Sequence, residues 1–197
     1  FASINTDSTA ESRNFYRNML FTTEDIEKYI SGVILFDETF HQSELSSGMK
    51  FPEYLTSKNI FPGIKVDQGL EDFSPYEKLT KGLDGLSDRL GKYYALGARF
   101  AKWRAVITPG DSIPTNDCIL ANAKNLAKYA KKCQQANLVP IVEPEVLMDG
   151  VHTIDESFEI TSRTLNMVFD QLDEHNVSLQ GIVLKPNMIL SGYVCPY

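Results

Sequence analysis

Residues 99–107 read Arg-Phe-Ala-Lys-Trp-Arg-Ala-Val-Ile, an apolar run that contains two basic side chains in its middle. Its length and its aromatic and β-branched residues are typical of a buried strand. Lys102 and Arg104 are two residues apart, so on a strand they project from the same face. A charge in a buried strand is costly unless it is paired. The stretch therefore predicts a strand with one apolar and one polar face.

Four other apolar segments begin at intervals of roughly 30 to 40 residues, the length of a strand, a helix and two loops. The five predicted strands are residues 32–36, 62–66, 99–107, 138–142 and 181–184. Helices are predicted at 9–20, 23–30, 84–96, 116–135, and from a capping box at 153–156 to about residue 175. Regular alternation of strands and helices predicts an α/β fold with a parallel sheet.

Two layouts fit this alternation, an open doubly wound sheet and a closed TIM (β/α)8 barrel. The Gly-rich fingerprint of dinucleotide-binding open sheets is absent from the sequence. Charges lie in or at the ends of all five strands, which favours the barrel, because a barrel builds its active site at the C-terminal ends of its strands. We therefore expect residues 1–197 to be a single domain, an incomplete barrel with about five of the eight strands.

Composition excludes several classes of function. The formal net charge of −7 argues against nucleic-acid binding, which needs a basic surface. Apolar runs fall far short of the roughly 18 residues that cross a bilayer, so no membrane segment is predicted. The three cysteines form no Cys-x-x-Cys motif, which fits reduced thiols in the cytoplasm. The three histidines are scattered, so no metal site is predicted.

Lys185 follows directly after the apolar strand 181–184. A lysine amine attacks a carbonyl only when it is neutral, and apolar surroundings or a nearby cation favour the neutral form. Lys102, on another strand, is the candidate cation. The alternative is an exposed Lys-Pro turn at the end of a strand, and the spacing alone favours that alternative.

Glu143 and Glu145 supply two carboxylates on one predicted strand end. Such a pair can divide into one acid and one base, because like charges push two carboxyl groups to different protonation states. A solvated acidic turn explains the same pattern equally well.

Three basic residues, Lys65, Lys102 and Arg104, are candidates for holding phosphate groups, with Arg104 giving a planar, two-pronged grip. The alternative is that each pairs with a carboxylate, either Asp67 or one of the two glutamates. The two interpretations are compatible, since a basic site without a ligand often rests against carboxylates.

Four charged segments resemble, in order, segments of the class I fructose-bisphosphate aldolases. They are 63–67 (Gly-Ile-Lys-Val-Asp), 100–104 (Phe-Ala-Lys-Trp-Arg), 139–145 (Val-Pro-Ile-Val-Glu-Pro-Glu) and 181–188 (Gly-Ile-Val-Leu-Lys-Pro-Asn-Met). Residues 3–6 and 32–36 also resemble the family, so the resemblance covers nearly the whole chain. Gln180 departs from the pattern, which has Glu before the last of these segments.

The resemblance implies a TIM-barrel lyase of glycolysis and gluconeogenesis. Such an enzyme cleaves fructose 1,6-bisphosphate to dihydroxyacetone phosphate and glyceraldehyde 3-phosphate. By resemblance, Lys185 forms a Schiff base with the substrate, Glu143 transfers protons, Lys102 lies beside the imine and Glu145 tunes it. The implied substrate-binding residues are Lys65 and Arg104.

The family needs no metal and no organic cofactor, is usually tetrameric and cytoplasmic, and also binds cytoskeletal filaments. The resemblance places the first strand of the barrel before residue 1 and the last two strands after residue 197. Two alternatives remain open. One is another Schiff-base lyase on the same barrel that acts on a different sugar phosphate, and the other is a non-catalytic scaffold or cytoskeleton-binding protein.

Overall fold

The centre of the molecule is a parallel sheet with the strand order β1-β2-β5-β6-β7. A computed structural model describes residues 1–196. The strands are β1 (Gly32–Leu35), β2 (Phe61–Lys65), β5 (Phe100–Ile107), β6 (Val139–Val146) and β7 (Val183–Leu184). All five overlap the predicted strands. Their spatial order follows the chain without reversal, whereas a doubly wound sheet reverses its order at one point. This order is that of a barrel wall.

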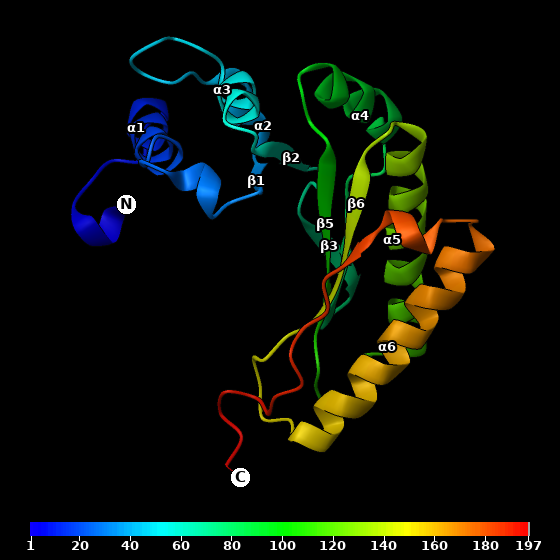
Figure 1. Cartoon of the computed structure of the whole chain (residues 1–197). Helices are drawn as coiled ribbons and strands as arrows, with labels where there is room; N and C mark the ends of the chain where they lie inside the picture. The colour runs from blue at the N-terminus through cyan, green and yellow to red at the C-terminus, as the bar shows by residue number, and fades with distance from the viewer. Residues whose placement is uncertain (197) are drawn as a thin grey trace.

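Helices cover the convex side of the curved sheet, with α4, α5 and α6 beside β5 and β6 (Figure 1). The helices are α1 (Ala10–Phe21), α2 (Asp37–His41), α3 (Phe51–Ser57), α4 (Leu86–Ala95), α5 (Asn116–Gln135) and α6 (Ile154–Glu174). Right-handed crossovers that always advance in one direction leave their helices on one face. The concave side is therefore open to side chains from the strands.

Threonine caps begin three of the helices. The hydroxyls of Thr9, Thr115 and Thr153 accept hydrogen bonds from backbone N–H groups in the first turns of α1, α5 and α6. The capping box predicted at 153–156 is present, with Glu156 bonded back to Thr153. Each cap satisfies an N–H group that has no partner within its own helix. The caps fix where the long helices start, and so how far the loops above the sheet extend.

The helix predicted at 23–30 is wrong. Asp25 adopts a left-handed conformation with φ of 61°, and only a short 3-10 turn, Ile26–Lys28, follows it. The sequence also did not predict α2, α3 or the antiparallel hairpin of β3 (Leu70–Ser74) and β4 (Glu77–Thr80). The hairpin packs on the sheet, where the Thr80 hydroxyl donates to the Arg104 carbonyl at 2.9 Å.

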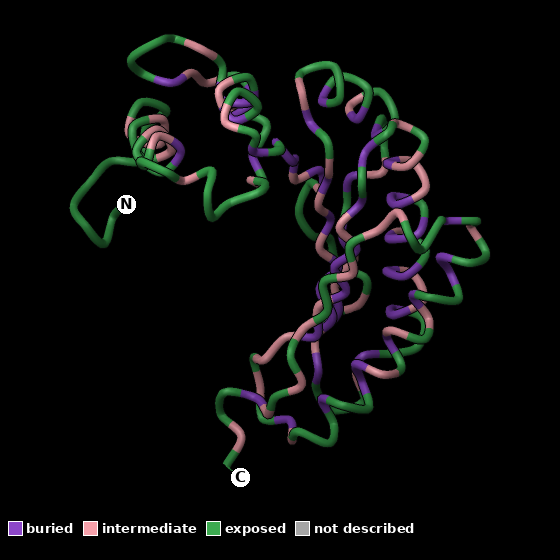
Figure 2. The backbone as a smooth tube through the Cα atoms, viewed as in Figure 1, coloured by how far each residue is buried: buried purple, intermediate pink, exposed green. Residues whose placement is uncertain are grey.

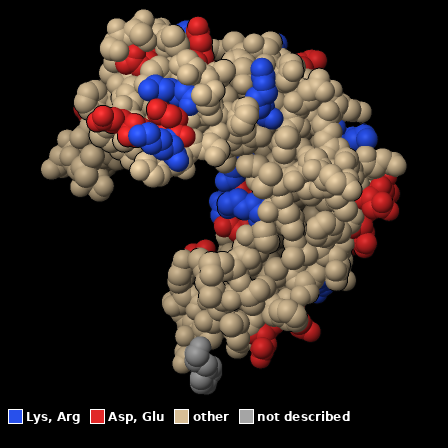
Figure 3. Space-filling model, in the orientation of Figure 1, with Lys and Arg blue, Asp and Glu red and all other residues tan. Residues whose placement is uncertain are grey.

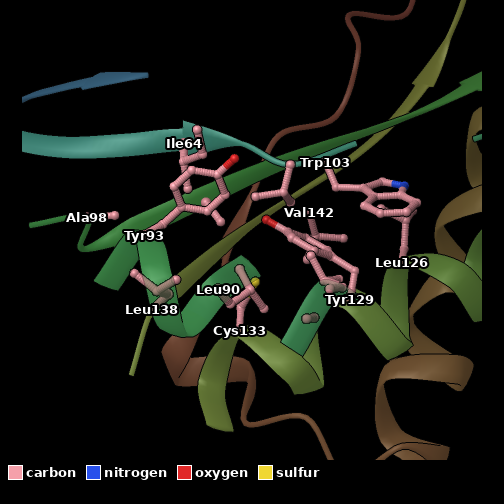
Figure 4. Close-up of a cluster of buried hydrophobic side chains, with 14 of the residues drawn as sticks. Ile64, Leu90, Tyr93, Ala98, Trp103, Leu126, Tyr129, Cys133, Leu138 and Val142 are labelled. Carbon is pink, nitrogen blue, oxygen red and sulfur yellow. The ribbon is translucent and has the colours of Figure 1, made fainter. Parts of the chain in front are cut away.

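The main core fills the layer between the sheet and its helices. Trp103 from β5 and Tyr129 from α5 are both fully buried, with ring centroids 5.5 Å apart, and Leu126 and Val142 lie beside them (Figure 4). Buried residues are concentrated on the strands and on the helix faces turned toward them, whereas the first 20 residues contain none (Figure 2). Because Trp103 points outward to the helices, its neighbours on β5 point to the concave face. Among residues 1–196, no helix is both long and apolar enough to cross a membrane.

Candidate active site

Lys185 emerges where β7 ends and leaves the sheet beside β6. Its backbone N–H donates to the Val142 carbonyl at 2.9 Å, which continues the parallel ladder by one bond. Its side chain turns to the next residue of β6, where Nζ donates to Glu143 Oε1 at 2.5 Å. The ladder therefore sets the position of the lysine relative to the carboxylate.

Lys102 reaches the same carboxylate from the opposite neighbouring strand. Its Nζ lies 2.9 Å from Glu143 Oε2. In the pairing of β5 with β6, Arg104 is opposite Glu143, so Lys102, two residues before Arg104 on the same face, is a near neighbour of Glu143. The Glu143 side chain is only 2% exposed. A buried carboxylate is tolerated when it is paired, and here two ammonium groups bracket it. Three residues predicted from the sequence are thus brought together, with an excess of one positive charge.

Arg104 and Glu145 form a second ion pair one step further along the same strands, between Arg104 Nε and Glu145 Oε2. Both residues line a cavity of about 400 Å³ together with Glu143 and Lys185. Basic and acidic side chains gather in the hollow of the molecule, as the space-filling view shows (Figure 3). A cavity that combines a lysine, an arginine and two carboxylates can bind an anion and transfer protons beside it.

Lys65 does not line this cavity. It lies opposite Lys102 in the pairing of β2 with β5, but its Nζ is paired with Asp67 Oδ1, two residues further along. Lys65 and Asp67 instead line a cavity of about 720 Å³ with Asp37 and Arg89. Lys102 is likewise not among the residues that line the cavity of about 400 Å³, so Arg104 is the one of these three basic residues that lines it. The alternative pairing with carboxylates is found for all three basic residues.

Within the described residues, the apolar residues that precede Lys185 do not surround its side chain. Its side chain is 55% exposed, and Val183, which projects from the same face, is 49% exposed. Ile182 and Leu184 project from the other face, where they pack against the main core. Residues that precede a lysine along a strand bury it only if they share its face, and two of these three do not.

Asn187 is a site residue to which the sequence analysis assigned no role. It lines the cavity of Lys185, and its side chain is hydrogen-bonded to β6 and α6. The sequence signal that could have identified Asn187 is a polar residue two positions after the lysine and directly after a proline. Among residues 1–196, no group of three or more His, Cys, Asp or Glu side chains is arranged to hold a metal ion.

A family model described as class I fructose-bisphosphate aldolase matches residues 1–197. The chain belongs to this family. An aldolase from Xanthomonas axonopodis pv. citri, named as a probable class 1 enzyme, is 51% identical over 99% of this chain and 59% of its own length. Fructose-bisphosphate aldolase 1 of Toxoplasma gondii is 50% identical, with 55% of its length covered.

The aldolase of Plasmodium falciparum, solved in a ternary complex with TRAP and a small-molecule inhibitor, superposes with a TM-score of 0.95. It is 46% identical, and the match covers all of this chain and 57% of that chain. The likeness confirms the predicted TIM-barrel fold. This aldolase chain spans somewhat more than half the length of the relatives it matches.

Proposed function

We propose that the natural protein at its full length is an aldolase that cleaves fructose 1,6-bisphosphate through an imine on Lys185. The observation that carries the proposal is the buried Glu143 carboxylate between Lys185 Nζ and Lys102 Nζ. A lysine paired with a carboxylate has a proton acceptor within reach, which an amine needs before it can attack a carbonyl. Membership of the class I aldolase family supports the same chemistry.

In the proposed reaction, the neutral amine of Lys185 attacks the ketone carbon of the sugar, and loss of water leaves a protonated imine. A carboxylate then takes the proton of the fourth-carbon hydroxyl, and the bond between the third and fourth carbons breaks. Its electrons flow into the imine to give an enamine, and glyceraldehyde 3-phosphate leaves. Protonation of the enamine and hydrolysis of the imine release dihydroxyacetone phosphate and the free lysine.

Each site residue has a proposed role. Glu143 carries the proton transfers because it is the carboxylate in contact with Lys185. Lys102 lies beside the imine, on the other side of the Glu143 carboxylate. Glu145 orients Arg104, which with Lys65 binds the phosphate groups of the sugar.

The proposal extends to the setting of the reaction. Residues 1–197 form a single domain of the barrel, which one strand before them and two after them complete. By the family resemblance, the protein uses no metal and no organic cofactor, is a cytoplasmic homotetramer, and binds cytoskeletal filaments. The Plasmodium falciparum relative was solved in complex with TRAP, which supports the idea that proteins of this fold bind partners.

The test is an assay of triose phosphate release by the purified natural protein. We expect cleavage of fructose 1,6-bisphosphate that is unaffected by a metal chelator. Cleavage of ketose monophosphates should be weaker, because one of the two phosphate-binding positions of the protein then has no phosphate to bind. Cleavage of another sugar phosphate without cleavage of the bisphosphate would favour the other Schiff-base lyase. Loss of activity with the chelator would contradict the metal-free mechanism.

A further inference from the structure

The strand that delivers Lys185 is short and ends before its neighbour does. β7 pairs with β6 only at Ile141↔Val183 and Val142↔Leu184, whereas β6 continues to Val146. After the bond from Lys185 to the Val142 carbonyl, no further backbone bond of this ladder is formed within the described residues. Lys185 is therefore the last residue held by the sheet itself.

The side chain of Asn187 takes over where the backbone ladder stops. Its Oδ1 accepts the hydrogen bond of the Val146 N–H at 3.0 Å, a donor that a longer β7 would have satisfied. Its Nδ2 donates to the hydroxyl of Thr161 on α6 at 3.2 Å and to the Met188 carbonyl at 3.0 Å. One amide thus ties the segment after Lys185 to the sheet and to the helix behind it.

A second anchor lies a few residues further on. The N–H groups of Gly192, Tyr193 and Val194 donate to the carbonyls of His152, Met148 and Gly150, at 2.8, 2.9 and 3.1 Å. Gly192 passes so close to the other loop that a Cβ atom there would lie 2.2 Å from the Gly150 oxygen. This anchor fixes the far end of the loop, and leaves Asn187 as the side chain that fixes the end next to Lys185.

We infer that Asn187 is a positioning residue that holds Lys185 against Glu143 for imine formation, an inference that rests on the proposed function. The backbone of Lys185 is held by its own hydrogen bond to the Val142 carbonyl and, two residues later, by the bond from the Val146 N–H to Asn187. An amide suits this position because it accepts a hydrogen bond without adding a charge. An aspartate there would compete with Glu143 for the lysine.

The experiment compares Asn187→Ala with Asn166→Ala in the natural protein at its full length. Asn166 is an exposed residue of α6, the helix that carries Thr161, and so controls for the loss of an amide. The probe is fructose 1,6-bisphosphate with borohydride added at timed intervals, which reduces the imine and reports how fast it forms. Competitive inhibition by inorganic phosphate reports the anion pocket separately.

We expect Asn187→Ala to slow imine trapping and kcat by about tenfold to a hundredfold, the scale of a displacement of about 1 Å in a reacting group. Inhibition by inorganic phosphate should change less than about twofold, because Arg104 and Lys65 lie on other strands. Thr161→Val removes one of the two acceptors of Nδ2 but leaves the bonds to Met188 and Val146, so it should have a smaller effect in the same direction. Asn166→Ala should trap at the unaltered rate.

Equal trapping rates in Asn187→Ala and in the unaltered protein would overturn the inference and leave the proposed function standing. Equal losses in trapping and in phosphate affinity would also overturn it, because they would mean general disruption of the site. An unaltered protein that forms no trapped adduct would overturn both the inference and the proposed function.

Discussion

Two glutamates of this chain are each bracketed by two basic side chains, but in different surroundings. Glu143 lies on the concave side of the sheet between Lys102 and Lys185, and its side chain is 2% exposed. Glu38 lies between Arg13 and Arg17, with distances of 2.6 and 2.5 Å, and its side chain is 36% exposed. The first group comes from strands and a strand end, and the second from α1 and α2.

The difference shows that the kind of base and its location decide what a charge cluster can do. An arginine stays protonated at every accessible pH, so the Glu38 cluster can only bind and stabilise. A lysine can lose its proton and become a nucleophile, so the Glu143 cluster can take part in covalent chemistry. Glu143 and Lys185 of this cluster also line a cavity of about 400 Å³ that a ligand can enter.

The largest expected contrast comes from neutralising the two glutamates. Glu143→Gln should lower kcat by about a hundredfold to ten-thousandfold, the usual contribution of a general acid or base, while an imine still forms. Glu38→Gln makes the same chemical change and should leave kcat within about twofold, because it is outside the cavity. Steady-state assays of both variants test this prediction. Equal kcat values in Glu143→Gln and Glu38→Gln would contradict the proposed difference between the two clusters.

A smaller effect is expected from the arginines. Arg104→Ala should raise KM for fructose 1,6-bisphosphate by about tenfold or more, since a hydrogen bond to a charged group contributes about 1.5–3 kcal/mol. Arg13→Ala, which removes an arginine from the Glu38 cluster, is the matched control and should leave KM unchanged. The role in phosphate binding is wrong if KM is the same in the Arg104 variant and in the unaltered protein.

The smallest expected effect concerns stability and pH. Hydrogen bonds from Arg13 and then Arg17 lower the pKa of Glu38 from 4.5 to about 2. Because the folded state has the lower pKa, this stabilisation is present above the unfolded pKa of about 4.5 and is lost as the pH falls toward 2. Because the group is more than a third exposed, solvent screening limits the contribution to about 1 kcal/mol or less.

Urea unfolding of the unaltered protein and of Glu38→Gln checks this prediction. The difference in the free energy of unfolding should be constant above about pH 5 and should shrink as the pH is lowered below about 4. A difference that grows on acidification would contradict the account of the Glu38 cluster.

The sequence predicted the sheet well because each strand lies in an apolar run, and in 99–107 the charged Lys102 and Arg104 project from the face opposite to Trp103. It missed the β3–β4 hairpin, because residues 70–80 are largely polar and become a hairpin by packing against β5. It placed a helix at 23–30, where the left-handed conformation of Asp25 prevents one. The local sequence pattern therefore identified the helices and strands that have strong hydrophobic periodicity. It failed where tertiary contacts decide the secondary structure.

The candidate site was predictable from the sequence only where the geometry of a single strand fixes the arrangement. Lys102 and Arg104 share a face by strand geometry alone, so their joint placement followed from their spacing. The bracketing of Glu143 by two lysines depends on the register of β5, β6 and β7, which spacing does not set. The pairing of Lys65 with Asp67 and the bond from Val146 to Asn187 likewise appear only in three dimensions.

Borohydride reduction of the natural protein in the presence of fructose 1,6-bisphosphate, followed by mass spectrometry of its peptides, tests most directly whether Lys185 forms the imine. We expect a stable adduct on the peptide that contains Lys185, and no adduct in a correctly folded Lys185→Met variant. Methionine is similar in size to lysine and lacks the amine. Covalent trapping that persists in Lys185→Met would contradict the account and make Lys102 the next candidate for the imine.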